Sequence, residues 1–358
     1  MSETQPHPSS GAPPVVLAAA RRVDGTGSLE AVDAALAQLT GQGARVRTLG
    51  IDSLPGPLAA PPNQPPESFR TGCGPVMAVA RAWELLRDNH ADAVLVRGEE
   101  PLRTGYDPRD RRRLMRFYPG ITVPEAYTRL AYALMGRLGM DAETFRRLAD
   151  GLLANYRATA RERGLDPFRG QGKRTCTELF RYEDCANPNI DFAGALLLGS
   201  PAAADRLPPP ATRRIRLLGV AVETVDDGPE HVAVIASYGH LRKAYLRACE
   251  QAGIAFTQRF LAGQALLEAY TCFPPVPLGF LLASGIAADP EALLPVLEAH
   301  AITVTGGMNL AGAPWHNPAL HALIVTHERL LEGRHECGLV HGNGGVGGYQ
   351  GVAILGAG

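Results

Sequence analysis

The residue types most able to carry acyl chemistry occur at three places in this sequence. Cys73 directly precedes a helix predicted over 76–89. A thiol at a helix N-terminus is expected to have a lowered pKa, because the helix dipole stabilises the thiolate. His316 and His341 lie in a C-terminal segment whose glycines cluster at 342–348. Backbone N–H groups beside histidines can receive an oxyanion, so these residues favour a pocket that handles an acyl group.

Each of these residues also has a purely structural interpretation, which the sequence leaves open. A cysteine of unassigned role usually packs as a small buried hydrophobe. A single histidine is usually a hydrogen-bonded residue of the core, and a glycine cluster often only builds a tight turn. Cys73, His316 and His341 are therefore candidates, and a structure has to show whether they meet in one pocket.

Composition argues against several classes of partner and site. The 358 residues carry a formal net charge of -1, which argues against nucleic acid or an anionic membrane as a bulk electrostatic partner. The six cysteines form no CxxC pair, so we expect reduced thiols and neither a disulfide framework nor a metal site. No apolar run reaches the roughly 18 residues that span a bilayer, and no signal peptide is visible. The sequence therefore predicts a soluble cytoplasmic protein.

The elements that must position the candidate residues alternate between strands and helices in two successive sets. In the first set we predict strands over 15–20, 44–51 and 91–96, and helices beginning at Ser28 and Val76. In the second set we predict a strand over 214–223, helices over 240–252, 275–285 and 318–331, and strands over 338–340 and 352–355. Ile302 and Val304 predict a further β segment ahead of Gly306.

This repeated order implies an internal duplication of an α/β unit. We expect residues 1–13 to be a disordered tail, 14–207 to be the first half and 208–358 to be the second half. Residues 101–189 interrupt the alternation of strands and helices. They contain an arginine-rich stretch at 109–116, followed by two predicted helices.

Five motifs, in the correct order, resemble those of the thiolase superfamily. Two of them are the segment 184–200, which resembles the strand closing the first half of that fold, and the loop EAYTCFP at 268–274, which resembles the family's NEAF or HDCF loop. The other three are Gly306-Gly307 for the family's GG, Gly312-Ala313-Pro314 for its GHP, and Gly342-Asn343-Gly344-Gly345 for its CxG turn. The similarity covers most of the chain after Phe69.

This resemblance implies a thiolase-like five-layer αβαβα sandwich of two duplicated α/β halves. Residues 101–189 then correspond to the helical loop domain that thiolases insert in the first half. The implied substrate is a CoA thioester, delivered as acyl-CoA or on an acyl-carrier protein, with no tightly bound cofactor. Gly307 and Gly345 in the matched glycine motifs, and Arg112 in the arginine-rich stretch, are expected to contact the CoA group. The implied assembly is a homodimer.

The sequence departs from the family at every catalytic position. Thr71 stands at the nucleophilic cysteine, Tyr270 at the Asn or His of the loop, Ala313 at the GHP histidine and Asn343 at the second cysteine. Possible replacements lie close by in the chain, namely Cys73, Cys272, His316 and His341. We therefore expect Cys73 to be a nucleophile at the bottom of a channel, with the base relocated to His316 or His341.

Three functions remain open on these residues. The first is an atypical acyltransferase that forms C–C bonds by Claisen-type chemistry on a thioester. The second is a thiolase-like aldolase in which phenols such as those of Tyr270 and Tyr349 exchange protons, and which works with a small OB-fold partner. The third is a non-catalytic subunit that binds acyl-CoA or serves as a scaffold for a partner enzyme.

Overall fold

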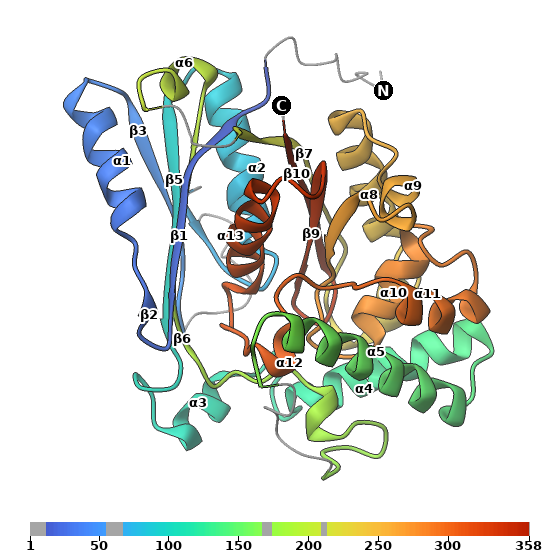
Figure 1. The fold of residues 1–358 in the computed structure, drawn as a ribbon. Coiled ribbons are helices and arrows are strands. Elements are labelled where there is room, and N and C mark those ends of the chain that lie inside the picture. Colours follow the sequence, from blue (N-terminus) through green and yellow to red (C-terminus); the bar gives the residue numbers. More distant parts are fainter. Residues whose placement is uncertain (1–11, 55–66, 167–173, 209–212, 358) are drawn as a thin grey trace, which may run out of the picture.

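The computed structural model describes residues 12–54, 67–166, 174–208 and 213–357. The expected disordered tail therefore lies almost wholly outside the described residues. The frame of these residues is a ten-stranded mixed sheet in the order β4-β3-β5-β6-β1-β7-β10-β9-β8, with β2 paired to β1 (Figure 1). The strands are β1 (Val15–Val23), β2 (Thr26–Gly27), β3 (Val46–Ile51), β4 (Ser68–Phe69), β5 (Ala93–Pro101), β6 (Asp191–Gly199), β7 (Ile215–Thr224), β8 (Ala265–Glu268), β9 (Cys337–Gly344) and β10 (Tyr349–Ala357).

Helices pack on the outer faces of the two halves of this sheet and also between the halves (Figure 1). They are α1 (Glu30–Gly41), α2 (Gly74–Arg87), α3 (Pro108–Leu114), α4 (Val123–Leu138), α5 (Ala142–Glu162), α6 (Pro201–Ala204), α7 (Val232–Ile235), α8 (Gly239–Ala252), α9 (Phe256–Leu261), α10 (Pro275–Ala283), α11 (Leu293–Ala299), α12 (Gly307–Leu310) and α13 (Pro318–Leu331). Short 3-10 helices lie at Tyr182–Asp184, Pro229–His231 and Pro290–Ala292. No helix in the described ranges has the length and apolar character needed to cross a membrane.

The two halves of the sheet repeat one pattern of strand pairing. In the first half, β1 pairs antiparallel with β6, β6 antiparallel with β5, and β5 parallel with β3. In the second half, β7 pairs antiparallel with β10, β10 antiparallel with β9, and β9 parallel with β8. The halves join where Val15 of β1 pairs with Arg216 of β7. This repeat supports the internal duplication expected from the order of elements.

Five layers follow from how the helices pack. Helix α1 packs on the outer face of the first half-sheet, and α8 packs on the outer face of the second. Helices α2 and α13 pack against each other and against strands of both half-sheets, so they form the middle layer (Figure 1). The αβαβα sandwich predicted as the fold class is therefore confirmed.

The difference between outer and central helices is visible in their sequences. In the outer helix α1, only Val32 and Leu39 are buried. The central helix α2 buries nine of its 14 residues, and α13 buries 11 of 14. A helix enclosed between two sheets must be apolar around most of its surface, because both faces are removed from water. The central strands follow the same rule, as the run Leu196 to Leu198 of β6 is fully buried.

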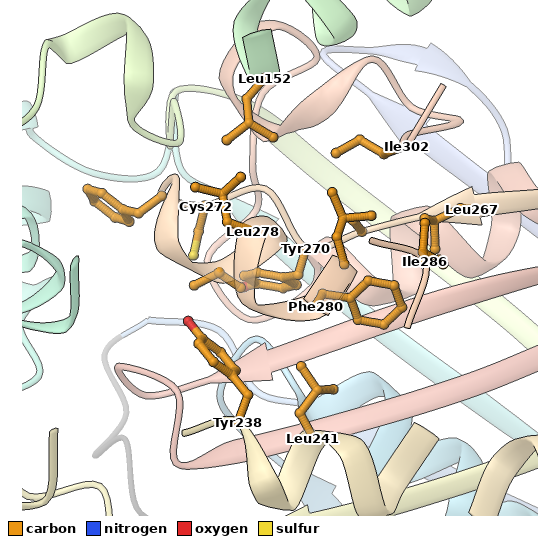
Figure 2. Packing of buried hydrophobic residues seen from close by; sticks show 14 of the residues in the cluster. Leu152, Tyr238, Leu241, Leu267, Tyr270, Cys272, Leu278, Phe280, Ile286 and Ile302 are labelled. Carbon is orange, nitrogen blue, oxygen red and sulfur yellow. The ribbon is translucent and has the colours of Figure 1, made fainter. Parts of the chain in front are cut away.

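The interruption at 101–189 contains the two predicted helices, α4 and α5, and also the short helix α3 within the arginine-rich stretch, which was not predicted. Thr122 and Glu125 form a reciprocal capping box at the start of α4, and the Asp141 carboxylate caps α5. Leu152 of α5 packs in one hydrophobic cluster with Leu278 of α10 (Figure 2). The inserted helices are thus fixed to the second half of the molecule by apolar packing.

The β segment predicted at Ile302 and Val304 is absent; residues 301–306 form an irregular segment. The backbone N–H groups of Val304 and Thr305 donate to the buried Glu268 carboxylate, at 2.6 and 2.9 Å. Backbone groups bonded to a side chain are not available for a strand ladder, although the apolar side chains still point into the core. The pattern of apolar residues was therefore interpreted wrongly as a strand.

Candidate active site

A cavity of about 620 Å³ lies between the inserted helices α3 and α4 and the segments around Tyr270, His316 and Asn343. This is the size of a typical small-molecule site. Its lining contains exposed arginines, aromatic rings and a group of polar side chains: Arg109, Arg112, Arg113 and Arg116; Phe117, Tyr127, Phe273 and Trp315; Thr71, Tyr270, Cys272, His316 and Asn343. Two pairs of the rings are stacked, Phe117 on Trp315 and Tyr127 on Phe273. The cavity therefore combines positive charge, apolar walls and groups that can exchange protons.

The segment just before α2 brings three parts of the chain together. A Cβ atom on Gly72 would overlap the Tyr270 hydroxyl and the Asn343 carbonyl oxygen, so only glycine allows this approach. Thr71 has a φ of 73°, which is strained for a β-branched residue. Its hydroxyl accepts a hydrogen bond from the Cys73 N–H at 3.3 Å. The position matched to the family's nucleophile thus lies at the cavity, where it carries a hydroxyl in place of a thiol.

Cys73 lies at the N-terminus of α2, as the sequence predicted, but not at the bottom of the cavity. It is fully buried in the central apolar cluster with Val76, and it is not among the residues that line the cavity. Burial raises the pKa of its thiol strongly. The predicted lowering of this pKa is therefore wrong, because desolvation of the thiolate outweighs the favourable helix dipole.

Two other predicted residues, Tyr270 and Cys272, lie on the loop that follows β8 and pack among buried hydrophobic residues (Figure 2). Both also line the cavity. Burial raises the pKa of the Cys272 thiol to about 12 and that of the Tyr270 phenol well above its usual value. Both groups are therefore protonated at neutral pH and can act as hydrogen-bond donors. Tyr349, at the start of β10, is not among the lining residues.

His316 is buried and lines the cavity. Its Nδ1 lies 2.7 Å from the Asp52 carbonyl oxygen, which requires the proton on Nδ1 and leaves a lone pair on Nε2. Nε2 is buried and has no hydrogen-bond partner among the described residues. Desolvation lowers the pKa of His316 to about 4, so the ring is neutral at neutral pH. The imidazole is therefore neutral and held in one tautomer by the Asp52 carbonyl oxygen.

Glu100 holds the His316 turn, and the sequence analysis missed it. Its carboxylate, fully buried at the end of β5, accepts the His316 N–H at 2.9 Å, the Asn317 N–H at 3.1 Å and the Asn317 side-chain amide at 3.0 Å. Burial raises the pKa of Glu100 to about 7. The alternation of β5 was the signal that could have revealed it, because Glu100 shares a face with the buried Gly98 and lies opposite the exposed Arg97 and Glu99.

His341 differs from His316 in that both of its ring nitrogens are engaged. Nδ1 accepts the Tyr270 N–H at 3.3 Å, and Nε2 donates to Gln350 Oε1 at 2.6 Å. The ring stacks on Phe280 with centroids 4.6 Å apart, and burial lowers the pKa of His341 to about 4. It lines a separate hollow of only about 10 Å³. The predicted pairing of His316 and His341 across the glycine loop is not seen, because the two residues line different hollows and both ring nitrogens of His341 are engaged by Tyr270 and Gln350.

Asn343 lines the cavity but belongs to the same hydrogen-bonded chain as His341. Its Oδ1 accepts from the Gln350 amide at 2.7 Å, and its Nδ2 donates to the Tyr127 hydroxyl at 3.1 Å. The Tyr127 hydroxyl in turn donates to the Gly345 carbonyl oxygen at 2.8 Å. The chain fixes the glycine hairpin and leaves the Asn343 amide little freedom to bind a ligand.

The three residues expected to contact CoA have different positions. Arg112 and Gly345 line the cavity. Gly307 has a φ of 79° at the start of α12, packs against Tyr156 and does not line the cavity. On the described surface, the side chains of Asp226, Glu230 and His231 lie close enough together to share a cation, but such exposed acidic groups are common without one.

Comparison with known proteins gives structural relatives only. No protein-family model and no curated protein matches the sequence. A monomeric SCP2-thiolase-like protein type 1 from Mycobacterium smegmatis is similar in structure, with a TM-score of 0.70 and 20% identity over 97% of this chain and 78% of that chain. The Ltp2-ChsH2(DUF35) aldolase has a TM-score of 0.66 and 16% identity over 96% of this chain and 98% of that chain. Human mitochondrial 3-ketoacyl-CoA thiolase has a TM-score of 0.65 and 15% identity over 97% of this chain and 99% of that chain.

Proposed function

On the thiolase-like fold that this chain has, we propose that it binds an acyl thioester of CoA and cleaves or forms a C–C bond by acid–base catalysis, without an acyl-enzyme. The observation that carries the proposal is that His316, whose buried Nε2 has no hydrogen-bond partner among the described residues, lines the same cavity as Tyr270. A base and an acid are present there, whereas burial has raised the pKa values of both Cys73 and Cys272. Thiolate chemistry is therefore disfavoured.

Two regions of the cavity bind different parts of the substrate in this proposal. The arginines of α3, Arg112 among them, receive the phosphates of CoA through charge-assisted hydrogen bonds. The stacked rings of Phe117 and Trp315 give an apolar wall for the pantetheine arm and the acyl chain. The thioester then reaches the polar end of the cavity near Tyr270 and His316.

With a β-hydroxyacyl thioester, the two side chains divide a retro-aldol reaction between them. His316 Nε2 accepts the proton of the β-hydroxyl group, the bond between the α and β carbons breaks, and its electron pair moves into the thioester enolate. The Tyr270 phenol then donates its proton to the α carbon. The products are a carbonyl compound and a shortened acyl thioester, and His316 returns its proton to the phenolate through water. The reverse sequence forms the C–C bond.

The experiment is a cleavage assay with a panel of 3-hydroxyacyl-CoA thioesters of increasing size, alongside calorimetric titration with CoA. We expect activity in the wild type and in Cys73→Ala, and a large loss in Tyr270→Phe and His316→Ala. A covalent acyl group on Cys272, detected by mass spectrometry, would establish the acyltransferase instead. Tight CoA binding with no cleavage of any thioester would establish the non-catalytic subunit.

The proposal extends to assembly. The aldolase similar in structure to this chain contains a DUF35 component, and we propose that this chain also works with a small OB-fold partner and as a homodimer. Light scattering after size-exclusion chromatography tests the second part. A monomer at micromolar concentration would count against it, as the Mycobacterium smegmatis relative is described as monomeric.

A further inference from the structure

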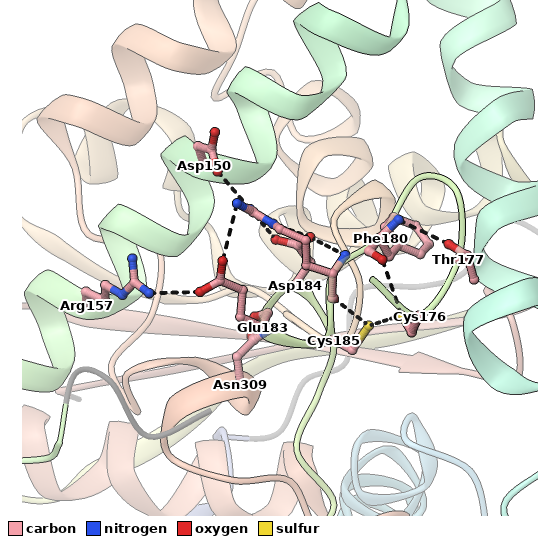
Figure 3. A network of polar contacts seen from close by, with 10 residues as sticks. Asp150, Arg157, Cys176, Thr177, Phe180, Glu183, Asp184, Cys185 and Asn309 are labelled. Carbon is pink, nitrogen blue, oxygen red and sulfur yellow. Dashed lines mark hydrogen bonds and ion pairs between the residues drawn. The ribbon is translucent and has the colours of Figure 1, made fainter. Parts of the chain in front are cut away.

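Two cysteines that the proposed reaction does not use lie side by side in the cavity wall. The Sγ atoms of Cys176 and Cys185 are 3.6 Å apart, and both residues line the cavity (Figure 3). In reduced proteins, a cysteine pair this close needs only a small movement to reach the S–S bond length of about 2.05 Å. The sequence predicted six separate reduced thiols and gave no sign of this pair.

The local backbone keeps the two thiols facing each other. Cys176 donates its N–H to the Phe180 carbonyl oxygen at 3.0 Å, which folds residues 176–180 into a tight loop. Each sulfur also lies within hydrogen-bonding distance of a carbonyl oxygen of the same short segment, Cys176 of Phe180 at 3.5 Å and Cys185 of Arg181 at 3.3 Å. The pair therefore sits on a preformed turn whose closure requires little chain entropy to be lost.

A network of ion pairs between side chains holds this turn in place (Figure 3). The Arg181 guanidinium contacts the carboxylates of Asp184 at 2.6 Å, Asp150 at 2.7 Å and Glu183 at 3.3 Å. Glu183 is also paired with Arg157 of α5 at 3.0 Å. Glu183 and Asp184 are buried, so these contacts tie the turn that carries the thiols to the packed interior.

The two thiols differ in access. Cys176 is partly exposed, whereas Cys185 is buried. The hydrogen bond from Cys185 lowers the pKa of Cys176, while the pKa of Cys185 is raised by that same contact and by burial. An accessible thiol with thiolate character beside a buried second thiol is the usual arrangement of an attacking and a resolving cysteine.

We propose that Cys176 and Cys185 form a redox-active dithiol that closes to a disulfide on reaction with a low-molecular-weight disulfide. The Cys176 thiolate attacks one sulfur of the small disulfide and expels one thiolate, leaving a mixed disulfide on Cys176. Cys185 then loses its proton, attacks the Cys176 sulfur and expels the second thiolate. The protein loses two hydrogens in total, and the small disulfide is reduced to two thiols.

Closure is coupled to the proposed reaction site through one backbone contact. Ala186, next to Cys185, donates its N–H to the Cys272 carbonyl oxygen at 2.8 Å. Cys272 belongs to the loop that carries Tyr270. A shift of the Cys185 backbone on disulfide formation is thus transmitted to that loop, and we expect CoA affinity to differ between the two redox states.

The test uses the full-length protein equilibrated in glutathione buffers of rising disulfide content, then alkylated and digested with trypsin under denaturing conditions. Cleavage after Arg174, Arg181 and Arg206 separates Cys176 in peptide 175–181 from Cys185 in peptide 182–206. We expect these two peptides to appear joined, with an intact mass lower by two hydrogens. A protein that keeps six free thiols in oxidising buffer overturns the proposal. So does a link between 182–206 and 260–329, which would join Cys185 to Cys272.

Two variants add a test of the order of attack. In Cys185→Ser, the resolving thiol is lost, so glutathione should remain attached to Cys176 as a mixed disulfide. The matched control is Cys249→Ser, because Cys249 is also partly exposed and its pKa is raised. This control should form the Cys176–Cys185 link as the wild type does. Glutathione found on any cysteine other than Cys176 in Cys185→Ser would contradict the assignment. None of these readouts depends on enzymatic activity, so they are independent of the proposed function.

Discussion

His316 and His341 lie in two regions that each place a histidine near an asparagine in the sequence, Asn317 and Asn343, and that differ in structure. Both rings are buried, and burial lowers the pKa of each to about 4. The His316 turn is held from its backbone side by Glu100, which leaves one ring nitrogen unpartnered among the described residues. The His341 hairpin is held through its side chains, and Gln350 and the Tyr270 N–H occupy both nitrogens.

This difference indicates which observation distinguishes His316, the histidine proposed to be functional, from His341, a structural one. Burial and a lowered pKa are the same in both regions, so neither can decide. What decides is whether the hydrogen-bonding capacity of the ring is satisfied within the fold, because an unsatisfied buried acceptor carries an energetic cost that the fold would otherwise avoid. Four predictions test whether the two regions are as different as their hydrogen bonds indicate.

The largest expected effect is on catalysis. His316→Ala should lower the retro-aldol rate by about 10²–10⁴-fold, because a positioned acid or base contributes that much to proton transfer. His341→Ala should leave the rate per folded molecule near that of the wild type. The measurement is turnover of the best thioester, corrected for the folded fraction by circular dichroism. Equal losses in both variants would remove the distinction.

The next largest effect is on stability, and here His341→Ala should be the more damaging of the two substitutions. His341→Ala removes a stacked ring and leaves the Tyr270 N–H and the Gln350 carbonyl oxygen without partners, which should reduce the free energy of unfolding by about 3 kcal/mol. His316→Ala opens into the cavity, where water can replace the ring, and should cost about 1 kcal/mol. Urea unfolding monitored by fluorescence gives both values. A larger loss for His316→Ala would contradict the assignment.

His316 and His341 should contribute alike to the pH dependence of the free energy of unfolding until a ligand is added. Each folded-state pKa lies near 4, below the unfolded value of 6.5, so the unfolded chain binds more protons. The stabilising contribution is present above pH 6.5 and is lost as the pH falls to about 4. His316→Gln and His341→Gln should each reduce proton uptake on unfolding by about one. Saturating thioester should change only the contribution of His316.

The smallest effect tests the end of the hydrogen-bonded chain. Tyr127→Phe removes the hydroxyl that accepts from Asn343 and donates to Gly345, while the stacked ring on Phe273 remains. We expect a loss of about 1 kcal/mol of unfolding free energy and an unchanged retro-aldol rate. Thermal unfolding with the turnover assay measures both. A fall in rate without a fall in stability would mean that this chain takes part in catalysis.

Most of the fold could be predicted from the sequence, because periodicity reports directly on burial. The helix predicted over 318–331 is the helix α13 that the structure contains, and the duplicated order of elements predicted the repeated strand pairing. The one wrong element, the β segment at Ile302 and Val304, shows the limit of this reasoning. A buried carboxylate took the backbone N–H groups there, and no apolar pattern records that.

The candidate site was only partly predictable. Tyr270, Cys272, His316, Asn343, Gly345 and Arg112 all line the cavity, because motif position places a residue near a given end of the fold. Cys73 and His341 lie within a few residues of the cavity in sequence but face the core. The surroundings of a side chain depend on partners such as Gln350 on the paired strand β10 and Glu100 on β5, which motif spacing does not reveal.

The pairing of β1 with β6 and β7 limits when this protein can fold during its synthesis. β1 precedes its partners β6 and β7 by a long stretch of chain. Helix α2 must likewise wait for α13 to cover it. Until those later elements have been made, the nascent chain exposes apolar surface that belongs in the middle layer. Such non-local pairing makes folding slow and the newborn chain dependent on protection from aggregation.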